Sequence, residues 1–457
     1  MLRIPSIVVA GLLLVVLPSC GDSSSEGSSD TTTIAARLSA IRAGRNKLVD
    51  ERRARTTTIA ARLSAIRVPA DKPTIQEAVD GAKEGDLILV AKGTYKESVS
   101  VETKNLVIRG EDRNDTIIDG EFTRENGIKV FSDGVAVENL TVKNHTSNGI
   151  FFTGDYGKGV TLHGYRASYI TASNNGLYGV YAFSAEDGMI DHSYGSGHPD
   201  SAFYVGQCQN CNALLTDNVA ENNMLGYSGT NSTGVTIVNS TFSHNRAGIV
   251  PNSLYSEQFG PNSGTTIVGN IVDDNNNPEA PDNKSFSTAY GNGIVIGGGS
   301  KIIVERNLVT GNKNAGIVVT DLPTSKDPAD GQEKAFKPEN NQVRGNVLTG
   351  NQYDLAYLTA TFASNTFGNC FEQNDFSTSF PADLEKKMTC STDPGTDLGD
   401  LAGILTSLIP SPPDIDYRKV TAPPRLDGMA DPLTAPARPG AAPPAVDVAA
   451  IVAPAKK

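Results

Sequence analysis

Short apolar segments that begin with a small residue recur along the middle of the chain, from about residue 135 to residue 360. The segments that begin at Gly179, Ala202, Gly226 and Gly248 follow one another at intervals of 22 to 24 residues. Each is as long as a strand and too short for a helix. A period of this size predicts a solenoid, in which each coil buries its inward side chains only when its neighbours stack against it.

Asparagine marks the turns between these segments. The spacing Asn307-x4-Asn312 before Gly316 recurs later in the chain, upstream of Leu355. Asparagine tolerates the left-handed backbone region, and its amide can bond the equivalent corner of the next coil. This pattern resembles the right-handed parallel β-helix of the pectin lyase-like superfamily, including NosD-like repeat proteins. The resemblance implies an all-β fold, a single-stranded right-handed parallel β-helix (solenoid) over residues 68–375.

The segments that flank the repeat have other compositions. Thr74 fits a helix N-cap before an apolar stripe, which predicts a short capping helix at the N-terminal end of the solenoid. Residues 376–457 lose the repeat and are rich in Pro and Ala, so we expect a mostly disordered tail, of which residues 391–457 are dispensable for folding. Residues 21–67 read as a flexible, low-complexity tether. Within it, segment 31–42 recurs unchanged at 56–67, either as a longer linker or as a basic helix that binds a membrane or wall.

The first twenty residues carry an apolar run behind Arg3 that ends in Leu17-Pro-Ser-Cys20. An apolar run this short predicts an export signal and not a membrane span. Its last four residues resemble a bacterial lipobox, in which Cys20 is lipidated and becomes the mature N-terminus. The resemblance implies an exported lipoprotein, anchored to the outer face of the bacterial cell membrane. The alternative is an ordinary signal peptide with a chance cysteine.

Charge and cysteine content narrow the set of partners. The net charge of −12 argues against nucleic acid. A zinc site would need a second close cysteine pair, so the spacing favours two disulfides, Cys208–Cys211 and Cys370–Cys390, although other pairings stay open. We expect no cofactor and no metal, apart from a Ca²⁺ ion that the polar stretch 273–277 has the oxygen ligands to hold.

All five histidines and eight of the fourteen tyrosines lie between residues 145 and 244. When columns are counted back from the segment starts, histidines fall on one corner column, and Asp and Arg fall on another. A groove lined in this way suits a polysaccharide with acidic sugars or a cell-wall glycan. The candidate catalytic residues are His198, Asp200, Tyr204, Arg246 and His244, and the candidate substrate contacts are Arg166, Gln207, Tyr227 and Asn252.

Lyase or C5-epimerase chemistry on a uronic acid needs a cation for the carboxylate, a base for the C5 proton and an acid for the leaving oxygen. Arg246, one of the two histidines and Tyr204 suit these roles in that order. In the alternative interpretation, the corner histidines are ladder residues that bond the next coil, and Arg246 bonds Asp200. The irregular stretches 251–264 and 321–340 should leave one corner of the solenoid and wall the same face.

The motifs of individual enzyme families are incomplete. Gly197-His198-Pro199-Asp200 differs in order from the Asp-Pro-His-Asp of alginate epimerases, and Ile190-Asp191-His192 matches pectate lyases in three residues only. One hypothesis is therefore an envelope lipoprotein that binds and modifies a glycan. The other is a non-catalytic scaffold or adhesin, or a NosD-like accessory protein, that docks another envelope component. The absence of Trp counts against the first, and the clustered His and Tyr count against the second.

Overall fold

A computed structural model describes residues 65–321, 323–359, 368–390 and 410–455. All of them belong to one compact unit, Thr58–Lys457. The predicted signal segment, the predicted lipidation residue Cys20 and nearly all of the predicted tether lie outside the described residues. None of the described helices has the length and the apolar character that crossing a membrane requires.

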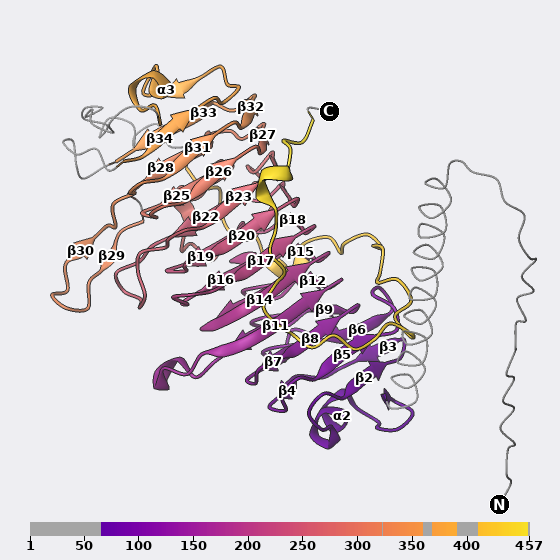
Figure 1. The fold of residues 1–457 in the computed structure, drawn as a ribbon. Helices are drawn as coiled ribbons and strands as arrows, with labels where there is room; N and C mark the ends of the chain where they lie inside the picture. Colours follow the sequence, from indigo (N-terminus) through magenta and orange to yellow (C-terminus); the bar gives the residue numbers. More distant parts are fainter. Residues whose placement is uncertain (1–64, 322, 360–367, 391–409, 456–457) are drawn as a thin grey trace, which may run out of the picture. The chain divides into compact units, whose positions relative to one another are not determined.

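Each coil of the solenoid supplies one strand to each of three stacked parallel sheets, which we name sheets A, B and C (Figure 1). Sheet A contains β1 (Ile66–Val68), β2 (Leu87–Val90), β5 (Val107–Gly110), β8 (Val135–Glu138), β11 (Leu162–Ser168), β14 (Ala185–Asp191), β17 (Ala213–Thr216), β20 (Val235–Val238), β23 (Thr266–Val268), β26 (Ile303–Glu305), β31 (Gln342–Arg344) and β34 (Cys370–Glu372). Sheet B contains β3 (Gly93–Tyr95), β6 (Thr116–Asp119), β9 (Thr141–Lys143), β12 (Thr171–Ser173), β15 (Tyr194–Ser196), β18 (Val219–Glu221), β21 (Thr241–Ser243), β24 (Ile271–Asp273), β27 (Leu308–Thr310) and β32 (Val347–Thr349). Sheet C contains β4 (Val99–Val101), β7 (Ile128–Val130), β10 (Ile150–Thr153), β13 (Val180–Phe183), β16 (Ser201–Gly206), β19 (Leu225–Thr230), β22 (Ala247–Asn252), β25 (Ile294–Gly297), β28 (Ala315–Thr320), β33 (Tyr353–Leu358) and β35 (Ser379–Phe380).

The solenoid thus runs from Ile66 to Phe380, slightly beyond the predicted 68–375 at both ends. Short helices accompany it: α2 (Ile75–Gly81), α3 (Leu384–Lys387), and the 3-10 turns η1 (Tyr156–Lys158), η2 (Ser287–Ala289), η4 (Tyr417–Lys419) and η5 (Val448–Ala450). The predicted capping helix is confirmed as α2, with the Thr74 hydroxyl accepting the Glu77 amide at 3.1 Å. Its buried side chains join the core together with β1, β2 and β4.

Strand pairing in register stacks like positions of successive coils into columns. One inward column of sheet C consists of fully buried apolar and aromatic side chains: Ile128, Ile150, Val180, Phe203, Tyr227 and Ile249. Because side chains alternate between faces along a strand, the residues next to these point outward. The core is therefore a continuous ladder along the axis, and each outer face is a separate set of columns.

Asparagine occupies the corners for the reason the sequence suggested. Asn139, Asn174 and Asn222 adopt positive φ at the corners that flank sheet B. A second set of asparagines is buried behind these corners and bonds the backbone of the neighbouring coil. The Asn307 side chain accepts from a backbone amide of the preceding coil at 2.9 Å. The Asn307 backbone amide in turn donates to the Asn346 side chain of the next coil at 3.0 Å. These ladders satisfy polar groups that the turns would otherwise bury without partners.

The two predicted disulfides are present, Cys208–Cys211 and Cys370–Cys390. The first closes the turn that leads from β16 to β17. The second joins β34 to the segment that follows α3, so that both residues hold the C-terminal end of the solenoid together. Bridges of this kind are typical of exported proteins.

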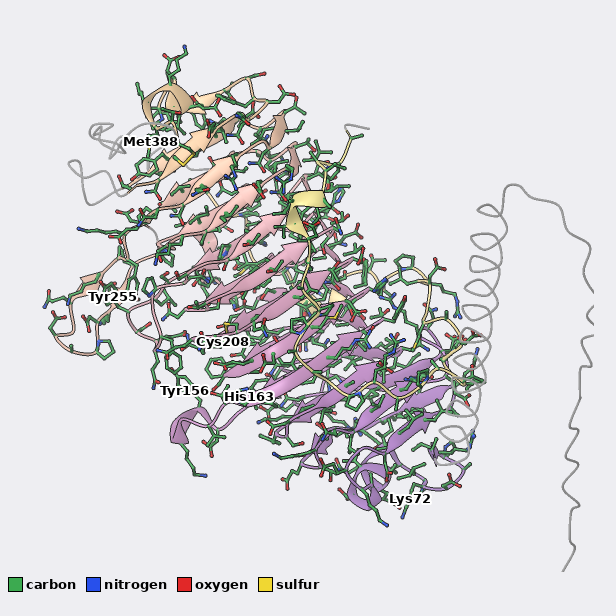
Figure 2. The ribbon with its side chains drawn as sticks, in the orientation of Figure 1. Lys72, Tyr156, His163, Cys208, Tyr255 and Met388 are labelled. Atoms are coloured by element: carbon green, nitrogen blue, oxygen red, sulfur yellow. A yellow bond between two sulfur atoms is a disulfide. The ribbon has the colours of Figure 1, made fainter. Side chains whose placement is uncertain are left out.

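Two long loops leave the corner between sheets C and A, as the sequence predicted. The loop at 251–264 and the loop at 321–340, which carries the hairpin of β29 (Ser325–Lys326) and β30 (Glu333–Lys334), pack on each other through stacked rings of Tyr255 and Phe336, 3.9 Å apart. Tyr156 on η1 contacts Phe259 of the first loop, and Figure 2 shows Tyr156 and Tyr255 along one edge of the solenoid. The loops therefore form a wall beside the outer face of sheet C.

The C-terminal tail departs most from the sequence-based expectation. Residues 410–455, which we name the strap, are extended as expected, but they lie against the solenoid instead of being disordered (yellow in Figure 1). Four arginines of the solenoid donate to carbonyl oxygens of the strap: Arg109, Arg113, Arg246 and Arg306. The composition contains too little apolar surface for a core, yet the backbone carbonyls of the strap provide acceptors to these cations, three of which are buried.

The strap passes along the solenoid twice. From Pro412, beside Arg246, it runs past Asn174 to the N-terminal coils, where Leu426 accepts from Asn114. It then returns along sheet A, where its residues join apolar clusters on the outer face of that sheet. The return ends at Ile451, whose carbonyl accepts from Arg306 at 2.8 Å. Much of the outer face of sheet A is therefore covered by the protein itself.

Candidate functional site

The corner between sheets B and C contains two of the five histidines in its buried ladder. Amide-to-side-chain bonds run from His145 to Asn175, and from His198 through Asn223 to Asn245, at 3.0–3.1 Å. His198 is fully buried, and its ring nitrogens lie 3.3 and 3.4 Å from the carbonyl oxygens of Ala172 and Asn175. It takes the place of an asparagine in the ladder. These contacts agree with the alternative interpretation of His198 as a ladder residue. They do not support a role for it as a catalytic base.

His244 does not belong to this ladder. It adopts a positive φ of 53°, points outward and lines a hollow on the outer face of sheet B with Glu221 and Asp273. The ladder position of that coil is Asn245, one residue later. The columns counted from the sequence place the ladder residue four positions before each strand start. In the segments that begin at Gly226 and Gly248, the ladder residue lies only three positions before the start.

Replacing His198 with Asn is expected to make the protein more resistant to acid. Burial lowers the pKa of His198 from 6.5 to about 4, so the folded state resists a proton that the unfolded state accepts. Its contribution to stability is therefore lost as pH falls from 6.5 towards 4, by up to about 3 kcal/mol. His198→Asn should flatten this decline in a series of thermal midpoints between pH 7 and pH 4. An unchanged slope would show that the ring is not held neutral in the ladder.

Arg246 is buried beneath the strap and does not face a groove. Its side chain is 2% exposed, and it donates to the carbonyls of Ala280, Pro412 and Pro413 at 2.7–2.8 Å, and to Asp282 at 3.2 Å. The expected partner Asp200 is not among these contacts. The predicted role of Arg246 in binding a ligand carboxylate is therefore wrong, because its donors are occupied by the chain itself.

Arg166 is likewise occupied within the protein. It lies on the outer face of sheet A and forms ion pairs with Glu138 and Asp191 at 3.1–3.2 Å. Glu138 also forms an ion pair with Arg109. Two of the other predicted contacts are buried: Tyr227 in the inward column of sheet C, and Asn252, which accepts from the Thr230 hydroxyl at 3.0 Å. None of these three is placed to contact a ligand.

Asp200 holds the insertion at 277–290 against the solenoid. Its carboxylate accepts from Asn283 at 2.8 Å and from the Ser201 hydroxyl at 3.2 Å, and Asn283 also donates its backbone amide to the Pro199 carbonyl. Burial raises the pKa of Asp200 to about 6, against the hydrogen bonds of Asn283, Tyr178 and Ser201. This carboxyl is thus a structural anchor that borders the outer face of sheet C.

The outer face of sheet C carries an aromatic surface that the sequence candidates included only through Tyr204. Pairing in register places Lys129, Phe151, Tyr181 and Tyr204 in one outward column over β7, β10, β13 and β16. Tyr181 is its centre, with ring centroids 4.7 Å from Phe151 and 4.8 Å from Tyr204. The Lys129 amine lies 5.2 Å from the Phe151 ring.

Further rings widen this surface on both sides of the column. Tyr178 stacks on Tyr181 at 4.2 Å with nearly parallel planes, and Phe183 lies 5.6 Å from Tyr181. Phe183 in turn contacts Tyr156 of η1 at 4.9 Å. We name the set Phe151, Tyr156, Tyr178, Tyr181, Phe183 and Tyr204 the aromatic platform. Its signal is present in the sequence, since Phe151, Tyr181 and Tyr204 each follow the first inward residue of a repeat segment.

Polar groups border the platform on the side of the long loops. The Tyr156 hydroxyl donates to Gln207 Oε1 at 3.1 Å, and the Gln207 amide donates to Glu257 in the loop at 251–264. Gln207 is thus the one predicted substrate contact that lies beside the platform, although its own side chain is buried. An extended row of aromatic rings with amide and carboxylate groups along one side is suited to a chain of sugar rings.

The part of the chain that the structure describes contains no group of three His, Cys, Asp or Glu side chains placed to hold a metal ion. In the stretch 273–277, where we expect a Ca²⁺ site, Asn275 belongs to the corner ladder, and Asn276 donates to the Gly311 carbonyl at 2.8 Å. Calcium binding at this loop stays a prediction.

Comparisons with known proteins give one family match and several distant structural alignments. A family model described as a right-handed β-helix region matches residues 164–325. Among solved structures, the Azotobacter vinelandii mannuronan C-5 epimerase AlgE4 A-module is 14% identical, with a TM-score of 0.48, over 68% of this chain and 93% of that one. Pectate lyase Pel9A is 14% identical, with a TM-score of 0.43, over 80% and 89%. The Dettilon tailspike protein is 15% identical, with a TM-score of 0.42, over 69% and 67%.

No curated protein matches the sequence significantly. The chain is a right-handed parallel β-helix. The solved structures are too distant to indicate an activity, so the activity of this protein has to be inferred from its own surface.

Proposed function

We propose that this protein binds a polysaccharide along the aromatic platform on the outer face of sheet C. The observation that carries the proposal is the continuous contact of partly exposed rings from Phe151 through Tyr181 to Phe183. Exposed apolar surface of this kind is costly to leave in water and marks sites of interaction. A sugar ring has an apolar face of C–H groups that packs on an aromatic ring, and hydroxyl groups around its edge that need hydrogen-bond partners.

The hydroxyl groups of the platform provide such partners. Burial raises the pKa of Tyr181 above the ordinary value, so its hydroxyl keeps its proton and can donate to sugar oxygens, whereas Tyr204 is 4% exposed and contributes mainly its ring. Glu257, at the edge, can accept from sugar hydroxyls. Since these tyrosines supply the stacking surface, the absence of Trp does not count against a sugar-binding face.

Lyase or C5-epimerase chemistry on a uronic acid is a narrower proposal for the same face. Arg166 and Arg246 are engaged within the protein, which leaves Lys129 as the cation beside the platform that would pair with a carboxylate. Tyr181 would then be the proton donor in place of Tyr204, which is nearly buried. Neither His198 nor His244 lies on this face, so the base that removes the C5 proton has no candidate among the histidines first considered.

The proposal includes a location in the cell envelope. A lipid anchor at Cys20 followed by a flexible tether would present the β-helix on the outer face of the bacterial membrane, where it meets envelope or extracellular glycans. A scaffold or adhesin that docks another envelope component through the same platform is the alternative outcome of the test.

The test is binding of the chain from Gly21 onward to a panel of neutral, amino-sugar and uronic-acid polysaccharides. Because the chain contains no Trp, its emission comes from 14 tyrosines, four of which belong to the platform, so bound sugar should change part of this emission. We expect at least one class to bind and to change this emission. The absence of binding across all three classes would contradict the proposal and favour a protein partner.

A further inference from the structure

We infer that the aromatic platform is closed at one end and takes the end of a glycan chain, not its interior. This inference rests on the proposed function and specifies how the ligand enters. It follows from the way in which exposure changes along the outward column of sheet C. Lys129, Phe151 and Tyr181 are partly exposed, whereas Tyr204 is 4% exposed and Ser228, the next residue of the column, is 2% exposed.

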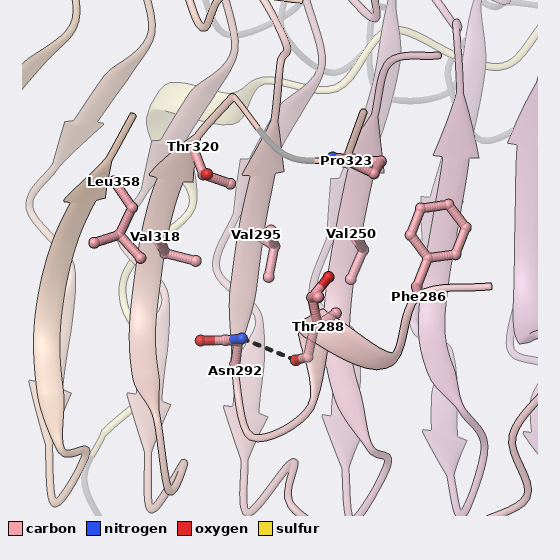
Figure 3. A pocket seen from close by; sticks show the side chains of 10 residues that line it. Val250, Phe286, Thr288, Asn292, Val295, Val318, Thr320, Pro323 and Leu358 are labelled. Carbon is pink, nitrogen blue, oxygen red and sulfur yellow. Dashed lines mark hydrogen bonds between the residues drawn. The ribbon is translucent and has the colours of Figure 1, made fainter. Parts of the chain in front are cut away.

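The insertion at 277–290 covers the members of the column that follow Ser228. Phe286 and Ala289 pack with Val250 and Val295, the following members of the column, in one apolar cluster. Figure 3 shows Phe286 and Thr288 of the insertion beside Val250, with Val295 on the neighbouring strand. A linear chain that lies on the rings of Phe151 and Tyr181 therefore meets protein when it reaches β19.

The insertion is fixed in place, so it is not a movable cover. Asn283 bonds the Asp200 carboxylate and the Pro199 carbonyl next to the closed end. Farther along, Asp282 forms an ion pair with the buried Arg246, and the Ala280 carbonyl accepts from the same guanidinium at 2.8 Å. A segment held by buried charged hydrogen bonds at several points is costly to displace.

The opposite end of the platform is open. Phe131, which follows β7, is 46% exposed, and the Lys129 amine lies 4.9 Å from its ring. Neighbouring strands are about 4.8 Å apart, so the column from Lys129 to Tyr204 spans about 14 Å. This length accommodates a few sugar residues, and the rest of the chain leaves over the N-terminal coils.

The polar groups at the closed end indicate which kind of terminal sugar is bound. Glu257 and Gln207 border the platform beside Tyr204, and Asp200 lies close enough to raise the pKa of Glu257 together with burial. Carboxylates accept hydrogen bonds from hydroxyls and repel other carboxylates. The terminal sugar in this position is therefore a neutral, hydroxyl-rich residue, and any acidic sugar is placed towards Lys129.

The experiment uses size-fractionated β-1,4-glucan and polygalacturonate as neutral and acidic probes, each at several chain lengths. Chain-end binding predicts a molar affinity that stops rising after a few sugars and a number of sites per gram that falls in inverse proportion to chain length. A constant number of sites per gram would overturn this inference and leave the proposed function intact. Binding of neither probe at any length, with no binding of the amino-sugar polysaccharide of the panel either, would contradict the proposed function itself.

A pair of variants tests the closed end separately. Glu257→Gln removes the charge beside Tyr204, and Glu279→Gln removes a similar charge on the insertion, beside Asn277 and away from the platform. We expect Glu257→Gln to weaken binding of a short neutral probe at least fivefold and Glu279→Gln to leave it unchanged. Equal effects of the two substitutions would contradict the placement of the terminal sugar.

Discussion

Removing residues 410–457 is expected to cost the protein about 5 kcal/mol or more of its free energy of unfolding, enough to abolish folding in a marginally stable chain. The strap accepts hydrogen bonds from Arg109, Arg113, Arg246 and Arg306, and the first three of these side chains are almost fully buried. Without the strap, these guanidinium groups lose part of their acceptors, and apolar residues of sheet A lose their cover. Denaturant unfolding followed by far-ultraviolet circular dichroism measures the loss.

The matched control is removal of residues 21–57, which lie in the tether before the compact unit. That deletion should leave the free energy of unfolding unchanged. If removal of residues 410–457 is equally harmless, the strap does not hold the solenoid, and the sequence-based expectation of a dispensable tail would be restored.

Substitution of a single arginine measures how much one strap contact contributes to the free energy of unfolding, without the other effects of truncation. Arg246→Ala should cost about 3–5 kcal/mol, because Asp282 stays buried without its cation. Arg246→Lys should have a stability between those of the unaltered protein and Arg246→Ala, because it keeps the charge but loses most of the bonds to Pro412 and Pro413. We expect both variants to retain glycan binding in proportion to the fraction folded, because Arg246 does not contact the platform.

Replacing Tyr181 with Ala is expected to lower glycan affinity about 30-fold or more, as the loss of a central aromatic contact commonly does. The ring lies between Phe151 and Tyr204 and stacks on Tyr178, so its removal interrupts the platform at its centre. Titration with the best-binding polysaccharide of the panel measures the change, alongside the thermal midpoint of each variant.

Two controls accompany Tyr181→Ala. Tyr181→Phe keeps the ring and should lose severalfold at most, and Tyr255→Ala removes a stacked ring in the long loops without touching the platform. Unchanged affinity in Tyr181→Ala, or an equal loss in Tyr255→Ala, would place the binding site elsewhere.

Sequence reasoning recovered the features that repeat and failed where a single coil differs from the rest. The period, the asparagine corners and the capping helix after Thr74 could be predicted, because each arises from local spacing or from a backbone preference. The columns of candidate site residues could not be counted reliably. One residue fewer in the coil of Gly248 moves His244 out of the ladder and puts Asn245 in its place.

Two other differences have physical causes that composition does not show. The strap has too few apolar side chains for a core of its own, but it also binds through carbonyl oxygens, which every residue has, so its Pro and Ala content predicts nothing about these contacts. Arg246 was singled out as a ligand-binding residue because an arginine has no role in an asparagine ladder. Its actual partners are an insertion and a strap distant in the sequence, which no local pattern places beside it.

The most direct test of the central claim, that the platform on sheet C binds a polysaccharide, is hydroxyl-radical footprinting of the intact chain with and without the bound glycan. The account predicts protection of Phe151, Tyr178 and Tyr181, with Tyr353 on β33 and the strap residue Tyr417 unchanged. Protection that instead concentrates on the outer face of sheet B, around His244 and Thr310, with the platform still reactive, would contradict it.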